Sequence, residues 1–263
     1  MIVPQLFGVC ALAATALAII VAIRQGRRSG LTPTDLAILI PSCVVATIVC
    51  AHVFDVAVYQ RDRLAESPGL WLRLYQGISL FGALAGIALV TVVVALARRL
   101  QLAVVADVAA LATLVGLTVG RLGCALVHDH PGRPTDSVFG VEFPASTALW
   151  LNLDHAGRDP IVLHDVGLEE FLVLLVLTAV ALVLVRRRMN AGKLAALIAI
   201  GYAVPRFCLD FLRHPATEPA YGLVARLTMG QWCSIVLLAG GVVGLVHVAA
   251  KSRRSALPAA TVR

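Results

Sequence analysis

The chain alternates between long apolar runs and shorter polar segments, and the apolar run recurs seven times. A run of about 20 apolar residues, folded as a helix, crosses the roughly 30 Å hydrocarbon core of a bilayer. Backbone polar groups at that depth find no water, so each run is predicted to be helical. The predicted helices cover residues 2–23, 36–59, 74–97, 103–126, 166–185, 194–213 and 227–250.

The composition supports a membrane protein. The chain is 59% hydrophobic and 14% charged, with a mean hydropathy of +0.89, whereas soluble domains carry roughly 25% charged residues. We therefore expect an all-α polytopic bundle of seven transmembrane helices. Residues 1–250 form one domain whose outer loop covers residues 127–165, and residues 251–263 form a short basic tail that we expect to be disordered.

The basic residues indicate the orientation of the chain in the membrane. The net charge is +7, but the basic residues cluster beside apolar runs rather than in a patch suited to nucleic acid. Clusters beside cytoplasmic helix ends are typical of membrane proteins. The predicted topology therefore places the N-terminus outside and the C-terminus in the cytoplasm. The clusters are Arg24/Arg27/Arg28, Arg98/Arg99, Arg186/Arg187/Arg188 and Lys251/Arg253/Arg254.

The sixth run carries a polar face inside the membrane. Tyr202, Arg206, Asp210 and Arg213 are spaced so that they share one face of a helix. Two guanidiniums around one carboxylate leave a positive charge for a bound anion, and ionisable groups at this depth are functional candidates. The alternative is a structural ion pair, with Arg213 extending to the membrane interface.

Arg121 ends the fourth run and is the residue most indicative of function. A guanidinium there is costly unless an anion repays it by bidentate hydrogen bonding, and a phospholipid headgroup is the expected anion. Gly120 beside it permits close approach of a backbone or a headgroup. Gly132 and Arg133 follow in a stretch that also fits an ordinary surface turn.

The second run has a smaller polar face, formed by His52, Asp55 and Tyr59. It is either part of a site or a hydrogen-bonded contact between helices. The motifs of soluble hydrolases, zinc proteases and nucleotide-binding loops do not occur, and the six cysteines are scattered. We expect no metal and no cofactor.

Five segments of the chain match, in order and spacing, the signature segments of one family. On these segments the chain resembles the bacterial prolipoprotein diacylglyceryl transferases, which have seven helices and an external N-terminus. Gly120-Arg121-Leu122-Gly123, closed by Gly132-Arg133, is similar to GRxGNFxNxExxG. The other matches are Ser79 and Gly82 with SFHGG, His164 and Glu170 with HPxQLYE, Gly201-Tyr202 through Arg206, Asp210 and Arg213 with GYxxxRFxxExxR, and Thr228-Met229-Gly230-Gln231 with TMGQ.

The chain departs from the family pattern at several polar positions. Phe81 replaces the histidine of SFHGG, and a phenylalanine cannot transfer a proton. Cys124 replaces an asparagine, while Asp129 and Asp210 each replace a glutamate. His52 stands where the family tends to have an arginine.

The resemblance implies a reaction that needs no cofactor. The family transfers a diacylglyceryl group from phosphatidylglycerol to the lipobox cysteine thiol of a prolipoprotein, in the bacterial inner membrane. Glycerol 1-phosphate leaves and a thioether forms. The implied partners are phosphatidylglycerol, the prolipoprotein signal peptide and the lipid bilayer, with no nucleic acid.

The resemblance also implies roles for individual residues. We expect Arg121 and Arg206 to bind the lipid phosphate, and Asp210 and Arg213 to orient them. Asp129 is the leading candidate for the base that removes the thiol proton, with His128, His130 and His52 as alternatives. The expected substrate-binding residues are Tyr202, Arg213, Gly132, Arg133, Gly120 and His52.

Two other functions remain open at this stage. One is a non-catalytic paralogue that binds anionic phospholipid after losing its proton-transfer group. The other is a related transferase that uses the same lipid donor with a different acceptor. A transporter is disfavoured because the sequence shows no inverted repeat and no paired broken helices.

Overall fold

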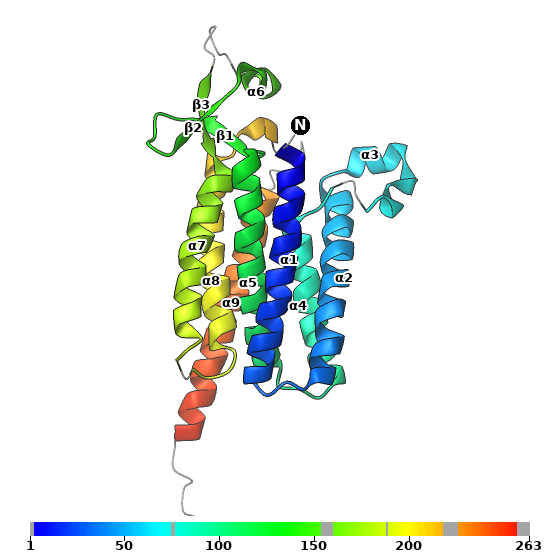
Figure 1. Ribbon diagram of the computed structural model, residues 1–263, viewed down its shortest axis with the longest axis vertical. Coiled ribbons are helices and arrows are strands. Elements are labelled where there is room, and N and C mark those ends of the chain that lie inside the picture. The colour runs from blue at the N-terminus through cyan, green and yellow to red at the C-terminus, as the bar shows by residue number, and fades with distance from the viewer. Residues whose placement is uncertain (1–2, 75–76, 154–159, 188, 218–225, 257–263) are drawn as a thin grey trace, which may run out of the picture.

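The computed structural model describes residues 3–74, 77–153, 160–187, 189–217 and 226–256. Within them, seven helices are long and apolar enough to cross a membrane, and they run side by side along the long axis of the molecule (Figure 1). The polytopic helix bundle predicted from the sequence is thereby confirmed. The seven are α1 (Val3–Arg28), α2 (Pro33–Val58), α4 (Leu80–Ala97), α5 (Leu102–Val127), α7 (Val166–Leu184), α8 (Lys193–Leu209) and α9 (Met229–Ala256).

Four predicted helix boundaries were wrong: α1 ends at Arg28 rather than 23 and α8 at Leu209 rather than 213, and the start of α4 and the end of α9 differ more. Helix α4 begins six residues after the predicted position 74, because the Ser79 hydroxyl accepts a hydrogen bond from the Gly82 amide and caps the helix there. Helix α9 continues to Ala256, so residues 251–256 are helical rather than part of a disordered tail. The rest of that predicted tail, residues 257–263, and Arg188 of the basic cluster after the fifth predicted helix lie outside the described residues.

The helices pack as two connected groups. Helix α2 lies against α4, and close approach is possible because Gly82 and Gly86 face the α2 backbone. A Cβ at Gly86 would lie 2.6 Å from the carbonyl oxygen of Ala46. Helix α1 packs along α5, and α5 in turn contacts α7 and α8. Leu174 and Leu111 are buried between α5, α7 and α8 and form the centre of that second group.

The long outer loop contains a small antiparallel sheet, which corrects the prediction of an all-α chain. Strands β1 (Pro131–Pro134), β2 (Gly140–Phe143) and β3 (Ile161–Asp165) pair in the order β1-β3-β2. Apolar side chains of the strands and of helix α6 (Ala145–Trp150) form a separate core around Leu163. Residues 154–159 of this loop lie outside the described residues. Four- and five-residue strands are too short for a hydrophobic period to distinguish them from loop.

Both long loops lie at one end of the bundle. The sheet and the segment with α3 (Arg61–Glu66) and the 3-10 turn Pro68–Leu72 lie at the end where α1 begins, and α9 ends at the opposite end (Figure 1). This relative placement of loops and termini agrees with the predicted topology. Arg121 and Arg206 lie near the loop-bearing ends of α5 and α8, so the fold places both at the same depth.

The opposite ends of α5 and α8 are joined by one carboxylate. Asp107 accepts hydrogen bonds from the amides of Gly192 at 2.8 Å and Ala195 at 2.7 Å, at the start of α8. These amides are among those that a helix leaves unpaired at its N-terminus, and a negative charge there is also favoured by the helix dipole. Asp107 therefore fixes the start of α8 against α5, at the end of the bundle opposite the sheet.

We expect Asp107→Ala to lower the free energy of unfolding by about 1–3 kcal/mol, because two part-buried amides lose their acceptor. The midpoint of thermal unfolding in detergent measures this loss. Asp107→Asn keeps a carbonyl oxygen and serves as the matched control, with a smaller expected loss. An Asp107→Ala midpoint equal to that of the wild type would show that this carboxylate does not anchor α8.

Candidate active site

Two arginines that are far apart in the sequence line one cavity. Arg121 from α5 and Arg206 from α8 are 8% and 4% exposed, and both border a polar cavity of about 270 Å³ at the loop-bearing end of the bundle. Arg213 and His130 line the same cavity. The expectation that the two guanidiniums converge on one space is therefore met.

Glu170 lies between the two arginines and was given no role by the sequence analysis. It is 1% exposed. Its Oε2 lies 3.1 Å from Nη2 of Arg121 and 3.8 Å from Nε of Arg206, while its Oε1 accepts a hydrogen bond of 2.6 Å from the Tyr202 hydroxyl. One carboxylate from α7 thus joins α5 to α8. The signal that could have found it is a glutamate inside an apolar run.

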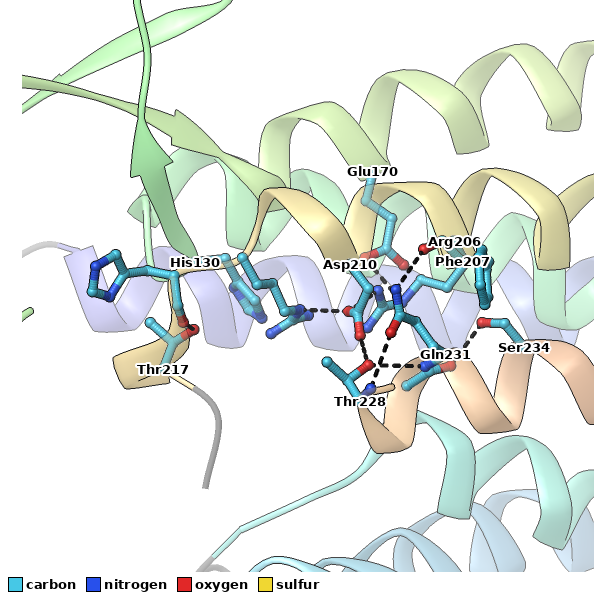
Figure 2. Close-up of polar contacts among 12 residues, drawn as sticks. His130, Glu170, Arg206, Phe207, Asp210, Thr217, Thr228, Gln231 and Ser234 are labelled. Atoms are coloured by element: carbon cyan, nitrogen blue, oxygen red, sulfur yellow. Dashed lines mark hydrogen bonds and ion pairs between the residues drawn. The ribbon is translucent and has the colours of Figure 1, made fainter. Parts of the chain in front are cut away.

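A second carboxylate, Asp210, follows the end of α8 and is 3% exposed (Figure 2). Arg206 donates to its Oδ1 at 2.5 Å and Arg213 donates to the same oxygen at 2.8 Å. The Thr228 hydroxyl donates to its Oδ2. The predicted meeting of Arg206, Asp210 and Arg213 is confirmed, but not as one face of a helix: α8 ends at Leu209, a 3-10 turn follows, and the Arg213 backbone is extended. Thr228 is the partner that spacing could not reveal.

The start of α9 is built to hold Thr228 in place. The backbone amide of Gln231 donates to the Thr228 hydroxyl oxygen at 3.0 Å. In return, the side-chain oxygen Oε1 of Gln231 accepts from the backbone amide of Thr228 at 3.0 Å. This reciprocal pair is a capping box. Gly230 lies between them, and a Cβ there would come within 2.8 Å of Oδ2 of Asp210. The Thr-Met-Gly-Gln segment therefore positions a hydroxyl and leaves room for the ion pair.

Phe81 lines the polar cavity on one side and a separate apolar groove on the other. Its ring lies 5.7 Å from the guanidinium carbon of Arg206, a distance typical of a cation–π contact. Phe81 also lines a groove of about 820 Å³ between α4, α8 and α9, whose walls are almost entirely apolar. A charged cavity and a long apolar groove therefore meet at one residue.

The structure separates the predicted substrate-binding residues into two groups. Arg213 lines the cavity, but Tyr202 is bonded to Glu170 and is not among the described residues that border the polar cavity. Arg133 donates from Nε to the carbonyl oxygen of Arg213 at 3.1 Å, and Gly132 pairs with Arg213 as an isolated β-bridge. These two residues hold the Arg213 backbone rather than border the cavity.

Gly120 and His52 also lie apart from the cavity. A Cβ at Gly120 would meet no atom within 4 Å, so the space beside it is open. His52 is completely buried, with its two ring nitrogens 3.1 Å and 3.2 Å from the carbonyl oxygens of Leu70 and Gly77. Because both nitrogens face backbone carbonyls, the ring joins α2 to the outer segments and cannot reach a substrate in the cavity.

The candidate bases are likewise placed differently. His128 adopts a left-handed conformation at the end of α5 and lies 2.5 Å from Oδ2 of Asp165, outside the cavity lining. The side chain of Asp129 is 41% exposed and is hydrogen bonded to His130. His130 alone of these three borders the cavity, with its Nε2 3.1 Å from Nη1 of Arg121.

The Cys124 sulfur, an Asp129 oxygen and a His130 nitrogen lie within 4.8 Å of one another, the only such potential metal-ligand group among the described residues. However, Nη1 of Arg121 lies 3.7 Å from Sγ of Cys124 and also faces His130. A fixed cation that donates to two of these three groups opposes a second cation, so the geometry favours hydrogen bonding over metal ligation.

The fold and site define a polytopic membrane protein with an arginine-lined polar cavity beside an apolar groove. Comparison with known proteins gives the family. Residues 2–247 match the family model described as prolipoprotein diacylglyceryl transferase, and the chain belongs to this family.

Several curated relatives carry the name phosphatidylglycerol–prolipoprotein diacylglyceryl transferase. The chain is 30% identical to that of Bordetella avium over 234 residues, which cover 88% of this chain and 84% of the relative. It is 30% identical to that of Geobacter sulfurreducens over 236 residues, covering 89% and 85%. The match therefore spans most of both chains.

We expect Glu170→Gln to lower the free energy of unfolding by about 3–5 kcal/mol, because removing one partner of a buried ion pair leaves uncompensated charge. Thermal unfolding in detergent measures the loss. Glu169→Gln is the matched control. Glu169 is the adjacent residue, and its Oε1 lies 2.6 Å from Nδ1 of His164 rather than beside either arginine. Equal midpoints for the two variants would contradict a central role of Glu170.

Proposed function

We propose that this protein transfers the diacylglyceryl group of phosphatidylglycerol to the lipobox cysteine thiol in the signal peptide of a prolipoprotein. Membership of the family supports the reaction, and the single observation that carries it is the convergence of Arg121 and Arg206 on one cavity. The product is a thioether-linked diacylglyceryl cysteine, and glycerol 1-phosphate is released.

The charge of the site fits a phosphodiester. Three guanidiniums, those of Arg121, Arg206 and Arg213, contact two carboxylates, those of Glu170 and Asp210. The cluster therefore carries one net positive charge, which one phosphodiester anion neutralises. Arginine suits this task because its planar fork of donors matches phosphate oxygens.

The same charges favour the bond-breaking step. When the glyceryl carbon–oxygen bond breaks, the phosphate gains negative charge as it becomes a monoester. Fixed guanidiniums in a site with little water stabilise such charge without reorganising. Asp210 and Thr228 hold Arg206 and Arg213 in position, so their proposed role is orientation rather than contact with the lipid.

The apolar groove supplies the place for the lipid chains. It meets the polar cavity at Phe81, so a phosphate beside Arg206 can have its acyl chains between α4, α8 and α9. Many of the groove residues are alanine and glycine, which leave width for two chains. A diacyl lipid thus fits this site better than a soluble phosphate ester does.

The proposed orientation has the N-terminus and the sheet outside, in the bacterial inner membrane. The basic ends of the helices, including Arg28 and Lys251, lie opposite the sheet, as positive charge does on the cytoplasmic side of membrane proteins. The cavity then faces the compartment in which an exported prolipoprotein emerges, with its signal peptide still in the bilayer.

We expect Arg121→Ala and Arg206→Ala each to lower the rate of lipoprotein maturation by about 100-fold or more, because each removes donors to a charge that grows in the transition state. Complementation of a transferase-depleted strain, followed by the gel shift of a lipoprotein, measures this. Arg61→Ala is the control, since Arg61 is an exposed arginine at the same end of the bundle that bonds the carbonyl oxygen of Ala57.

Wild-type maturation in both cavity variants would refute the proposed phosphate site. Binding of phosphatidylglycerol by the wild-type protein without release of glycerol phosphate would instead support a non-catalytic lipid-binding protein. Release of glycerol phosphate with an acceptor other than a prolipoprotein would support a related transferase.

A further inference from the structure

We infer that His130, oriented by Asp129, is the general base that takes the proton from the acceptor thiol. This inference rests on the proposed function and deepens it, because it assigns the proton-transfer step to named atoms of this chain. Family membership does not supply the assignment, since Phe81 occupies the position of the family histidine and has no group that can accept a proton.

The hydrogen bonds around His130 define its tautomer. A guanidinium only donates, so Nε2 of His130 must accept from Nη1 of Arg121, which lies 3.1 Å away. The proton then resides on Nδ1, which donates to Oδ1 of Asp129. A neutral ring with an unprotonated nitrogen beside the cavity is the form that a general base requires.

The other acidic or basic side chains near the cavity are less suited to this role. Arginine is always protonated, which excludes Arg121, Arg206 and Arg213. Glu170 and Asp210 are buried and each is neutralised by two guanidiniums. Among the described cavity-lining residues this leaves Asp55, whose carboxylate accepts from Gln60, and Tyr59. A carboxylate is a weaker base than imidazole, and a tyrosine phenol carries its proton at neutral pH and so cannot accept another.

The position of His130 also links proton transfer to lipid binding. Arg121 contacts Glu170 through Nη2 and His130 through Nη1. A phosphate that takes the Nη1 donor frees the lone pair on Nε2 of His130. The lone pair on Nε2 then becomes available only when the lipid donor is bound beside it. Until then the hydrogen bond from Arg121 occupies this nitrogen.

The step balances in atoms and electrons. The thiol S–H bond breaks and an N–H bond forms at Nε2 of His130. The sulfur lone pair forms a C–S bond at the glyceryl carbon of phosphatidylglycerol, and the C–O bond to phosphate breaks with its electron pair leaving on oxygen. The imidazolium then returns its proton to the released phosphate monoester or to water.

Asp129 is a positioning residue in this scheme. Its carboxylate holds the Nδ1 proton of His130 and stabilises the imidazolium that forms. The sequence analysis named Asp129 as the leading base, but its side chain is 41% exposed and contacts the cavity only through His130. The expected base is therefore its neighbour in the chain.

The test measures transfer from phosphatidylglycerol to a lipobox peptide by the purified full-length protein between pH 6 and 8.5. We expect His130→Gln to lower the rate by about 100-fold or more at pH 7, in the range of a lost general base. Its residual rate should rise about tenfold per pH unit, because a free thiol with a pKa near 8.5 must then ionise by itself. The wild-type profile should be flatter. The charged and titratable groups that face His130 or line its cavity, among the described residues, are Asp55, Tyr59, Arg121, Cys124, Asp129, Arg206 and Arg213.

Three further variants separate a chemical role from a structural one. His128→Gln is the matched control, because His128 is also a loop histidine paired with a carboxylate but lies outside the cavity lining, and its rate should stay within about twofold of the wild type. Added imidazole should restore part of the rate of His130→Ala. Asp129→Glu should keep most of the activity, whereas Asp129→Asn should lower the rate with the same change of pH profile.

A wild-type rate and profile in His130→Gln would overturn the inference while leaving the proposed transfer reaction intact. Loss of activity in His130→Gln with a flat profile, and no rescue of His130→Ala by imidazole, would assign His130 a structural role and also overturn it. Loss of activity with a rising pH profile in Asp55→Asn instead would assign the base to Asp55. No transfer by the wild-type protein would remove both this inference and the proposed function.

Discussion

The contact of one buried carboxylate with two buried guanidiniums fixes the geometry of the whole site. Glu170 ties α7 to Arg121 on α5 and to Arg206 on α8, so three helices are held in register at the depth of the cavity. Removing such ions from water costs several kcal/mol each, and well-packed apolar side chains often give equal or greater stability. A membrane helix bundle has no need of this arrangement for folding alone. The proposed function gives it a purpose, because the guanidinium charge that the carboxylates leave uncompensated would be neutralised by a lipid phosphate.

The helices were predictable because their signal is local. Hydropathy alone located all seven spans, and the clusters of basic residues gave the relative placement of the loops. The contact of Arg206 with Asp210 was predictable too, since they are four residues apart, but the end of α8 at Leu209 and the extended backbone of Arg213 were not. The short strands of the outer loop were not, because β1 and β3 are paired through contacts between residues some 30 positions apart. No local period records such a pairing.

The part of the site that sequence reasoning missed depends on tertiary contacts. Glu170 is one of two adjacent glutamates, and nothing local distinguishes it from Glu169, which bonds His164 instead. Which of the two points inward is set by the start of α7, where the Asp165 side chain accepts from the Leu168 amide and fixes the first turn. The role of Thr228 depends likewise on the approach of α9 to the end of α8. Asp165 and Thr228, which lie in segments similar to the family signatures, thus cap the starts of α7 and α9.

Three of the departures from the family pattern lie beside the two cavity arginines: Cys124 contacts Arg121, and Phe81 and Asp210 contact Arg206. Cys124 presents a sulfur, a weak hydrogen-bond acceptor, to Nη1 of Arg121, where an asparagine side chain would offer a carbonyl oxygen. The same Nη1 has a stronger acceptor in Nε2 of His130, to which it donates. Phe81 meanwhile faces Arg206 across the cavity as an apolar ring. Phe81 thus leaves α4 without a proton-accepting group at the cavity, while His130 offers one beside Arg121. On the mechanism proposed above, the lipid phosphate would still bind to the arginines, and His130 would take over proton transfer.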